Sequence, residues 1–382
     1  MSQVPLRIGI VGAGTAGLYL ALLLQRAGHS VRLFDRAASP RTQGCGILLV
    51  SAGLEAIAQG AVPGLLDQLL RAGQPVRRFV IRNLKGGEIS RSEVDISDGE
   101  LPSQLIQRSA ILSALWNCFD ASDFRGNSEL IGLRQQENEV SAFFANGDYW
   151  NGDILIGADG IFSRVARSVA PERRLCYLGD RVWRGVVADP DFCLDGDFFV
   201  YARGRGIYAN FFDLGPNKKA ENITHWGFFH EQPLPEQRSE QLRLLTEPVP
   251  TEALARLPAD AAAVISGTPA ASTVCNWNFD IEPLARLSQG RVALIGDAAH
   301  AMSSSQARGM TAGLEDALVL ATELNRCPAE GAEGLAALAA YGEQRLPVVH
   351  RYQARSRDVS VRIGRRRRSP LRDPQADFSS VA

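Results

Sequence analysis

The sequence has almost no net charge and lacks any long hydrophobic run. Its 382 residues include 41 Lys and Arg against 42 Asp and Glu, which gives a formal net charge of −1. A chain without excess positive charge has no general attraction to nucleic acid or to an anionic membrane surface. No run of about 18 apolar residues is present, so no membrane-spanning helix is expected. We therefore predict neither a nucleic-acid partner nor a membrane partner.

The sequence also lacks patterns that hold metals or disulfides. Its six cysteines are scattered without a CxxC pair, and its five histidines show no metal-ligand spacing. We therefore expect no metal site. The N-terminus shows no charged segment followed by a long apolar stretch and a cleavage site, so we expect no signal peptide. Dispersed single cysteines in such a chain favour the reducing cytoplasm.

Glycine, in contrast, is abundant. It makes up 36 of the 382 residues, which is above the average share of about 7%. Glycine marks places where the backbone must approach another group closely.

The length predicts roughly two domains, at about 100–200 residues each.

The clearest glycine cluster is Gly-Ala-Gly-Thr-Ala-Gly at 12–17. It follows an expected strand over 6–11, opens an expected helix over 15–27 and leads to a second strand over 30–34. This is a βαβ unit of the usual size. In this context, GxGxxG predicts a dinucleotide whose pyrophosphate lies at the helix N-terminus.

Each glycine of this pattern has a physical task. Gly12 permits the tight turn, Gly14 lets the backbone approach the pyrophosphate, and Gly17 lets the helix pack close to the sheet. Asp35 follows about 20 residues later and can accept hydrogen bonds from a ribose diol. Its charge argues against a 2′-phosphate at this site, but the motif does not separate FAD from NAD.

Two further expected strands end in a carboxylate. Residues 153–164 read DILIGADGIFSR, with Asp159 after the strand, and residues 291–300 read RVALIGDAAH, with Asp297 after the strand. Ligands of open α/β sheets bind at the carboxyl ends of the strands, so both carboxylates are candidate cofactor contacts.

The remaining elements follow from periodicity and turn residues. A hairpin is expected over 76–96, strands over 128–156 and aromatic-rich strands over 181–230. Helices are expected over 54–72, 109–118, 236–246, 251–257, 311–325 and 332–354, a further strand pair over 262–279, and fading order after Arg355. The Arg365–Arg368 run is expected to be a solvated helix end and disordered tail, with contact to nucleic acid or anionic lipid as the alternative.

Together, GxGxxG, ADG and GDAAH resemble the motifs of the flavin-dependent aromatic hydroxylases, the class A flavoprotein monooxygenases with a 4-hydroxybenzoate hydroxylase-like fold. The resemblance covers about residues 6–350. Gln43-Gly44-Cys45-Gly46-Ile47 is similar to the family's Gly-x-Gly-Ile segment beside the flavin, and Arg108 is similar to its flavin-contacting arginine. The resemblance implies an α/β fold, in which a Rossmann-like FAD-binding domain is interleaved with a β-sheet substrate domain and followed by C-terminal helices.

The implied domains are discontinuous. The FAD-binding domain would comprise 1–75, 105–180 and 280–350, the substrate domain 76–104 and 181–279, and the C-terminal helix end and flexible basic tail 351–382. The cofactor-binding candidates are Gly12, Gly14, Ala16, Gly17, Asp35, Arg36, Gly46, Ile47, Arg108, Asp159, Gly160, Gly296, Asp297, Ala307, Arg308, Gly309 and Met310.

The implied activity uses bound FAD, NADPH or NADH as a transient co-substrate, and O2. The enzyme would hydroxylate an aromatic or related conjugated small molecule through a flavin C4a-hydroperoxide, as a monomer or homodimer. The alternatives are an oxidoreductase of the same fold without hydroxylation (a reductase, oxidase or halogenase) and a non-catalytic FAD protein. The tryptophan-rich signature of flavin halogenases is absent from the sequence.

One loop departs from the family pattern. Where many members have Pro-x-x-Gly-Gln-Gly-x-Asn, this chain has Ser304-Ser305-Gln306-Ala307-Arg308-Gly309-Met310-Thr311. Ala307-Arg308-Gly309 is similar to the Ala-Lys-Gly version of the 4-hydroxybenzoate hydroxylase branch. Because the family places this loop against the flavin ring, Arg308 would change the local charge there.

The strands of the expected substrate domain supply further candidates. His225 and Tyr208 are candidate catalytic bases, since His and Tyr often move protons. Candidate substrate-binding residues are Tyr201, Arg184, Phe211 and Trp226. Aromatic residues at alternating strand positions are also typical of a sheet core, and this alternative stays open.

Overall fold

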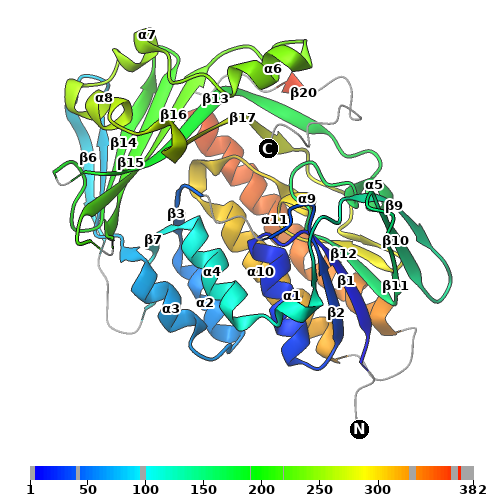
Figure 1. The fold of residues 1–382 in the computed structure, drawn as a ribbon. Helices are drawn as coiled ribbons and strands as arrows, with labels where there is room; N and C mark the ends of the chain where they lie inside the picture. The colour runs from blue at the N-terminus through cyan, green and yellow to red at the C-terminus, as the bar shows by residue number, and fades with distance from the viewer. Residues whose placement is uncertain are drawn as a thin grey trace.

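The computed structural model describes residues 5–39, 44–94, 100–189, 191–217, 219–326, 333–362 and 369–370 (Figure 1). The described residues form two large sheets, one in each half of the molecule, with helices packed around them. The expected α/β fold is thereby confirmed. Gln43 and the Arg365–Arg368 run lie outside the described residues.

A six-stranded sheet, ordered β18-β19-β12-β1-β2-β8, forms the centre of the lower half in Figure 1. Neighbours from β19 to β8 run parallel, and β18 is antiparallel to β19. The strands are nearly continuous apolar runs because both faces of the sheet are covered. The strands are β1 (Arg7–Val11), β2 (Ser30–Phe34), β8 (Phe124–Arg125), β12 (Ile154–Gly157), β18 (Ser288–Gln289) and β19 (Val292–Leu294).

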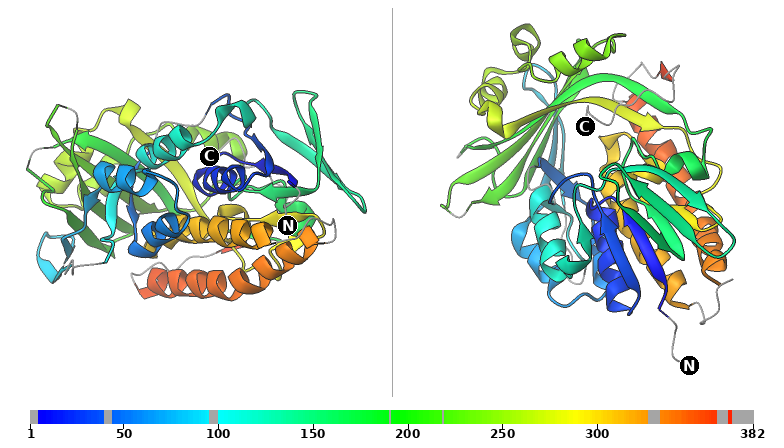
Figure 2. Two further views of the ribbon diagram at one scale, coloured as in Figure 1. Left: turned by 90° about the horizontal axis from the view of Figure 1, so that it is seen from below. Right: turned by 45° about the vertical axis from the view of Figure 1, so that its right-hand side comes forward.

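Helices cover one face of this sheet and a small meander covers the other. Helix α1 (Thr15–Arg26) packs against α10 (Arg308–Arg326), and α11 (Glu333–Arg362) lies beside α10 (Figure 2). On the opposite face, the Trp150 ring packs on Gly9, where an added β-carbon would lie 2.7 Å from the ring. The meander consists of β9 (Leu130–Gln135), β10 (Val140–Phe144) and β11 (Tyr149–Gly152).

The second large sheet has eight strands, ordered β17-β13-β16-β15-β14-β5-β6, with β20 paired to β13. It joins the hairpin expected over 76–96 to strands more than 80 residues later, as the interleaved division predicts. The exact domain boundaries stay a prediction. The strands are β5 (Arg78–Arg82), β6 (Glu88–Glu93), β13 (Leu175–Ala188), β14 (Asp197–Gly204), β15 (Ile207–Pro216), β16 (Asn222–Glu231), β17 (Thr273–Ile281) and β20 (Ser369–Pro370).

A three-stranded sheet links the two halves. It is ordered β3-β7-β4 and packs against one side of the eight-stranded sheet, which we call the FAD-facing side. Its strands are β3 (Gly46–Leu49), β4 (Gln74–Pro75) and β7 (Gln104–Gln107). The other helices are α2 (Ser51–Gln59), α3 (Leu65–Ala72), α4 (Arg108–Cys118), α5 (Ala166–Val169), α6 (Arg238–Leu244), α7 (Thr251–Leu254), α8 (Ala259–Ser266) and α9 (Asp297–His300), with 3-10 turns η1 (Ala121–Asp123), η2 (Ala270–Ser272) and η3 (Ser304–Gln306).

Three sequence-based expectations need correction. The expected strand pair over 262–279 is helix α8 followed by the single strand β17, because the alanine-rich start of the segment favours a helix. The expected helix over 54–72 is divided into α2 and α3 around Pro63 and Gly64. Helix α11 continues past Arg355 to Arg362, since Ser356 and Ser360 on its last turns are buried.

In the described part of the chain, no helix is both long and apolar enough to cross a bilayer. The same residues contain no group of three or more His, Cys, Asp or Glu that could hold a metal ion.

Candidate functional site

The three predicted motifs and Asp35 meet at one edge of the six-stranded sheet. Because β19, β12, β1 and β2 are parallel neighbours, their carboxyl ends place Asp297, Asp159, Gly12 and Asp35 along the same edge. The backbone of Gly12 touches both neighbouring strands: its N–H donates to Phe34 O at 2.7 Å, and an added β-carbon would lie 2.3 Å from Ala158 O. The structure therefore brings the separate motifs together.

The glycine turn leaves room for an anion at the N-terminus of α1. Gly12 has a φ of +111°, and a β-carbon on Gly17 would lie 2.0 Å from Gly12 O. A β-carbon on Gly14, in contrast, would meet no atom within 4 Å. Helix α1 has no side-chain cap and no acidic residue in its first turn. Open space beside free N–H groups fits the pyrophosphate of a dinucleotide.

Asp35 is fixed beside this turn by two backbone donors. Ala13 N–H donates to its Oδ2 and Ala37 N–H to its Oδ1, each at 2.8 Å. Each carboxylate oxygen keeps a further lone pair that can accept a hydrogen bond from a ribose hydroxyl. Arg36 beside it is exposed. The ribose contact of Asp35 and the cofactor contact of Arg36 stay predictions.

The carboxylate of Asp159 accepts hydrogen bonds from residues of its own motif. It accepts hydrogen bonds from Ser163 Oγ at 2.5 Å, from Arg164 N–H at 2.7 Å and from Val165 N–H at 3.2 Å. Burial raises the pKa of Asp159, and these donors oppose the rise. Gly160, with a φ of +81°, faces open space. The geometry therefore favours backbone contact through Gly160, with Asp159 holding the turn.

Asp297 stands at the start of α9 with an exposed side chain, so its carboxylate is available to hydroxyl groups of a cofactor. The preceding Gly296, with a φ of +59°, is tied to a buried carboxylate that the sequence did not reveal. Asp316 on α10 accepts from Gly296 N–H at 2.9 Å and from Arg345 Nε at 2.8 Å, and it bonds His300 Nε2 at 2.5 Å.

Asp316 is ionised in spite of its burial. Burial alone would raise the pKa of this carboxyl, but the charges of His300 and Arg345 lower it below its ordinary value. Asp316 thus joins α10, α11 and the GDAAH loop, and it fixes the backbone beside Asp297.

The loop at 304–311, which differs from the family pattern, is held in place by serine hydroxyl groups. Ser303 Oγ lies 2.5 Å from Ser305 Oγ and 2.6 Å from Ser360 Oγ, and Ser305 Oγ donates to Ser356 O at 2.7 Å. These bonds join the loop to the end of α11. The family's proline is thus replaced by contacts to the last helix.

The segment after this serine cluster returns to the candidate cofactor edge. Ala307 adopts a left-handed φ of +53°. The Arg308 guanidinium carbon lies 5.4 Å from the centroid of the Tyr352 ring. A β-carbon on Gly309 would lie 3.9 Å from Asp297 Oδ1, and Met310 is half-buried. The loop is therefore near Asp297, and its flavin contacts stay predictions.

The Gly46 segment is where the two halves of the molecule touch. Gly46 N–H donates to His225 Nδ1 at 3.1 Å, and a β-carbon on Gly46 would lie 2.6 Å from the Phe212 ring. Ile47 follows in β3, and the exposed Arg108 begins α4 directly after β7. Only glycine at position 46 lets the FAD-facing side of the sheet approach this segment.

His225 has the geometry of a positioning residue instead of the expected base. It is buried, and its Nδ1 lone pair is already used by Gly46 N–H. Burial and the charge of Arg184 lower the pKa of His225 to about 3. Because a base must accept a proton near neutral pH, the structure corrects this part of the prediction.

The buried His225 makes stability depend on pH. Below about pH 6.5 the unfolded chain protonates this histidine, whereas the folded chain resists protonation until about pH 3. Stability is therefore lost as pH falls through this window, by at most about 1.4 kcal/mol per pH unit. We expect His225→Asn to flatten this slope in urea unfolding between pH 4 and 7. A slope as steep in His225→Asn as in the wild-type chain would contradict the assignment.

The other substrate-domain candidates divide between the two sides of the eight-stranded sheet. Tyr208 and Arg184 lie on the FAD-facing side, because they occupy the same side as His225 in the strand register. Tyr201, Phe211 and Trp226 lie on the opposite side, buried in a core with α7 and α8. Trp226 Nε1 donates to Thr268 Oγ1 at 2.7 Å there. These three predicted substrate contacts are corrected to core residues.

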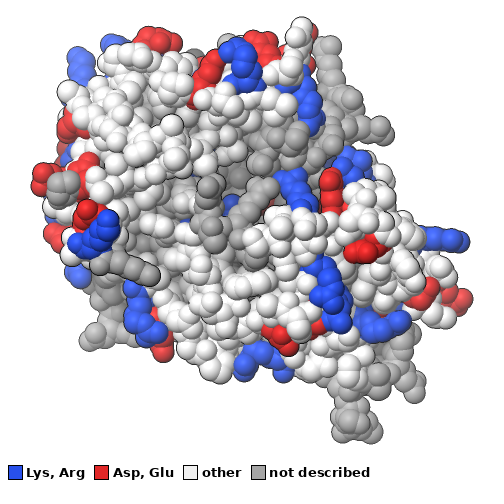
Figure 3. Space-filling view, viewed as in Figure 1, with Lys and Arg blue, Asp and Glu red and all other residues white. Residues whose placement is uncertain are grey.

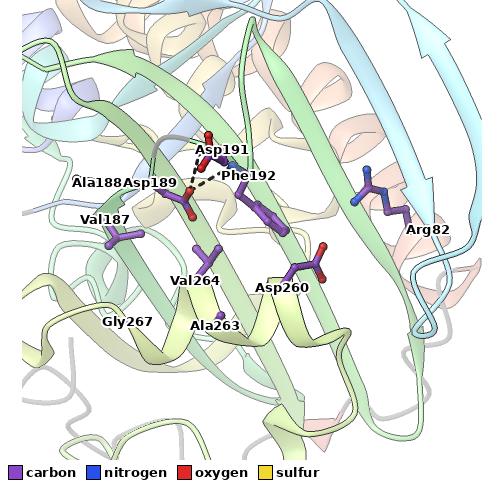
Figure 4. A pocket seen from close by; sticks show the side chains of 10 residues that line it. All are labelled: Arg82, Val187, Ala188, Asp189, Asp191, Phe192, Asp260, Ala263, Val264 and Gly267. Carbon is purple, nitrogen blue, oxygen red and sulfur yellow. Dashed lines mark hydrogen bonds between the residues drawn. The ribbon is translucent and has the colours of Figure 1, made fainter.

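The surface is hollowed between the eight-stranded sheet and the lower half of the molecule (Figure 3). A separate cavity of about 580 Å³ lies on the far side of the sheet (Figure 4). It is lined by α8 residues such as Val264 and by Asp189 and Phe192 after β13. Because it lies away from Gly46 and the glycine turn, it is not part of the candidate site.

The glycine turn, the convergent strand ends and the facing sheet define a dinucleotide-dependent oxidoreductase. Residues 6–356 match the family described as FAD binding domain. The chain belongs to this family and is a FAD-dependent monooxygenase, as the three motifs predicted.

Named relatives and solved structures agree with this. The aurachin C monooxygenase/isomerase of Stigmatella aurantiaca is 29% identical over 369 residues, which cover 94% of this chain and 89% of that protein. The 2-heptyl-3-hydroxy-4(1H)-quinolone synthase of Pseudomonas aeruginosa is 30% identical over 318 residues, covering 82% and 79%. Klebsiella pneumoniae HpxO, solved with FAD and uric acid, has a TM-score of 0.78 at 23% identity, covering 94% and 89%. That likeness shows the fold.

Proposed function

We propose that this chain uses NADPH or NADH and O2 to hydroxylate a small aromatic or related conjugated ring bound against the FAD-facing side of the eight-stranded sheet. One oxygen atom of O2 is inserted between a ring carbon and its hydrogen. The other oxygen atom is reduced to water by two electrons from the nicotinamide. The Gly46–His225 contact carries the proposal, because it joins the sheet side that bears the half-buried Arg184 and Tyr208 to the Gly46 segment, which the resemblance places beside the flavin. The relatives are named as enzymes acting on such rings.

FAD, when bound, supplies the electron transfer and the oxygen activation. The residues of the chain supply the binding. Gly14 and the α1 N-terminus would receive the pyrophosphate, Asp35 a ribose, and Asp297 hydroxyl groups of the cofactor chain. Arg164 Nη1 donates to Leu130 O at 3.2 Å, which steadies the turn after Asp159. The sheet excludes water from the bound ring.

Tyr208 remains our candidate for proton transfer. It lies on the FAD-facing side with its ring 5.8 Å from the Arg203 guanidinium carbon. The substrate would be held beside this hydroxyl.

The remaining parts of the proposal concern setting and assembly. Five cysteines in the described residues are free, which supports a reducing cytoplasm. We also propose that the protein is a monomer or a homodimer.

Ligand-stimulated oxidation of NADH and NADPH in air tests this function. We expect at least one ring among phenols, aromatic acids and N-heterocycles to accelerate oxidation about tenfold or more, with little hydrogen peroxide and with ¹⁸O from ¹⁸O2 in the product. Stimulation with stoichiometric peroxide and no ¹⁸O incorporation by every ring would favour the oxidase alternative. No stimulation by any ring would overturn the proposal.

A further inference from the structure

One row across the FAD-facing side of the eight-stranded sheet combines a cation, a glycine and an amide. Arg184 on β13 pairs with Gly227 on β16, and Gly227 pairs with Asn210 on β15. His225, the residue that bonds Gly46, stands two positions before Gly227 on the same side. The row therefore lies about 7 Å along the sheet from the contact with the candidate FAD segment.

Arg184 carries a charge that the described residues do not neutralise. It is half-buried, and its guanidinium carbon lies 5.7 Å from the centroid of the Phe229 ring. Asp180, the carboxylate four positions earlier on the same strand side, is taken by Arg203 in two bonds of 2.9 and 3.1 Å. A half-buried guanidinium without a carboxylate partner has N–H groups that can donate charge-assisted hydrogen bonds to an oxygen of a ligand.

Asn210 offers the complementary group. In the described part of the structure, its Oδ1 is buried and has no hydrogen-bond donor. This oxygen lies over Gly227, only 2.6 Å from where a β-carbon on that glycine would be. Glycine at position 227 is thus what admits the amide. An acceptor buried without a donor costs stability unless a ligand supplies an N–H or O–H.

The spacing of the two groups limits the ligand. Arg184 and Asn210 stand on strands two steps apart, about 9–10 Å between backbones. This distance suits one flat ring lying between the two side chains that makes a hydrogen bond at each of two opposite edges. The Phe229 ring beside Arg184 adds an apolar contact for the ligand.

We propose that Arg184 and Asn210 determine the specificity of the hydroxylation proposed above, on which this inference rests. The substrate class is a flat conjugated ring with a carbonyl or ionised oxygen at one edge and an N–H or O–H donor at the opposite edge. Arg184 binds the oxygen, and Asn210 Oδ1 accepts the hydrogen bond from the donor.

The test uses the FAD-loaded full chain and matched rings. 4-Pyridone and its benzo-fused analogue carry both groups, their N-methyl derivatives lack the donor, and pyrrole and indole keep the N–H but lack the oxygen. Dissociation constants are measured by perturbation of the flavin absorbance. We expect the wild-type chain to bind the complete rings about tenfold more tightly than the N-methyl rings, and about 30-fold more tightly than the rings without oxygen.

The variants assign each preference to one residue. Arg184→Met should lose the preference for rings with the oxygen and keep the preference for rings with the N–H. Arg184→Lys should retain part of the preference for the oxygen. Asn210→Leu should lose only the preference for the N–H, and Asn210→Ser repeats the test with a small polar side chain. Arg82→Met is the matched control, because Arg82 lies over the Phe199 ring at 4.2 Å, on the far side of the sheet. It should keep both preferences.

Two failures are distinguishable. If the variants keep both preferences, or if no ring of this class binds, the assignment of Arg184 and Asn210 is overturned. The same holds if only rings lacking one group are hydroxylated, although the monooxygenase function then stands. If the complete rings bind with the expected preferences but never stimulate NADH or NADPH oxidation, the recognition stands and the proposed function fails.

Discussion

Asp316→Ala is expected to destabilise the folded chain by about 3–5 kcal/mol, the usual cost of removing one partner from a buried ion pair. The Arg345 side chain, 6% exposed, would lose the carboxylate that contacts its Nε at 2.8 Å. Gly296 N–H and His300 would lose their acceptor as well. The GDAAH loop would then be free to move, so FAD retention should fall together with stability. Urea unfolding and the flavin content after gel filtration measure the two effects.

Two further variants separate the charge from its surroundings. Asp316→Asn keeps an oxygen for Gly296 N–H and should be less destabilising than Asp316→Ala. Arg326→Ala, on the same helix, removes an ion pair in which the arginine side chain is 69% exposed, and should change stability by less than about 1 kcal/mol. An Asp316→Ala chain as stable as the Arg326→Ala chain would show that the buried network does not support the fold.

This contribution also depends on pH. The folded-state pKa of Asp316 is lower than its ordinary value, so the stabilisation is present above about pH 4 and is lost as pH falls below that. Asp316→Asn should remove this part of the acid sensitivity.

The Asp316 network illustrates what the sequence could not predict. Local motifs were sufficient for the glycine turn, for Asp159 and for Asp297, because each motif lies within one strand and the loop after it. Asp316 meets Gly296, His300 and Arg345 only after α10 and α11 pack together. Nothing in the composition of α10 distinguishes Asp316 from a surface carboxylate.

The eight-stranded sheet shows a second limit. Alternation along a strand separates two sides, but both sides here are largely covered, so adjacent residues such as Phe211 and Phe212 are both buried. The alternation of residues along these strands therefore does not indicate which aromatic residues face the cofactor. The missed signal was Gly227, a glycine inside an aromatic strand, which marks a close approach by another group.

Gly14→Ala is expected to weaken FAD binding by about 100-fold or more, equivalent to about 2.7 kcal/mol, without destabilising the chain that lacks FAD. The added β-carbon would meet no protein atom within 4 Å. The residue has a φ of −71° and ψ of 179°, a conformation open to alanine. The methyl group therefore enters only the space assigned to the pyrophosphate. Titration with FAD and thermal unfolding of the FAD-free chain measure the two parts.

Two other glycines serve as comparisons because their surroundings differ in known ways. Gly132 in β9 also has nothing within 4 Å of an added β-carbon, so Gly132→Ala should change neither affinity nor stability appreciably. Gly17→Ala would place its β-carbon 2.0 Å from Gly12 O and should destabilise the fold itself, because a backbone atom must move. If Gly14→Ala bound FAD as tightly as Gly132→Ala does, the pyrophosphate could not lie over this turn, and the cofactor would have to approach the sheet edge through Gly160 and Asp297 alone.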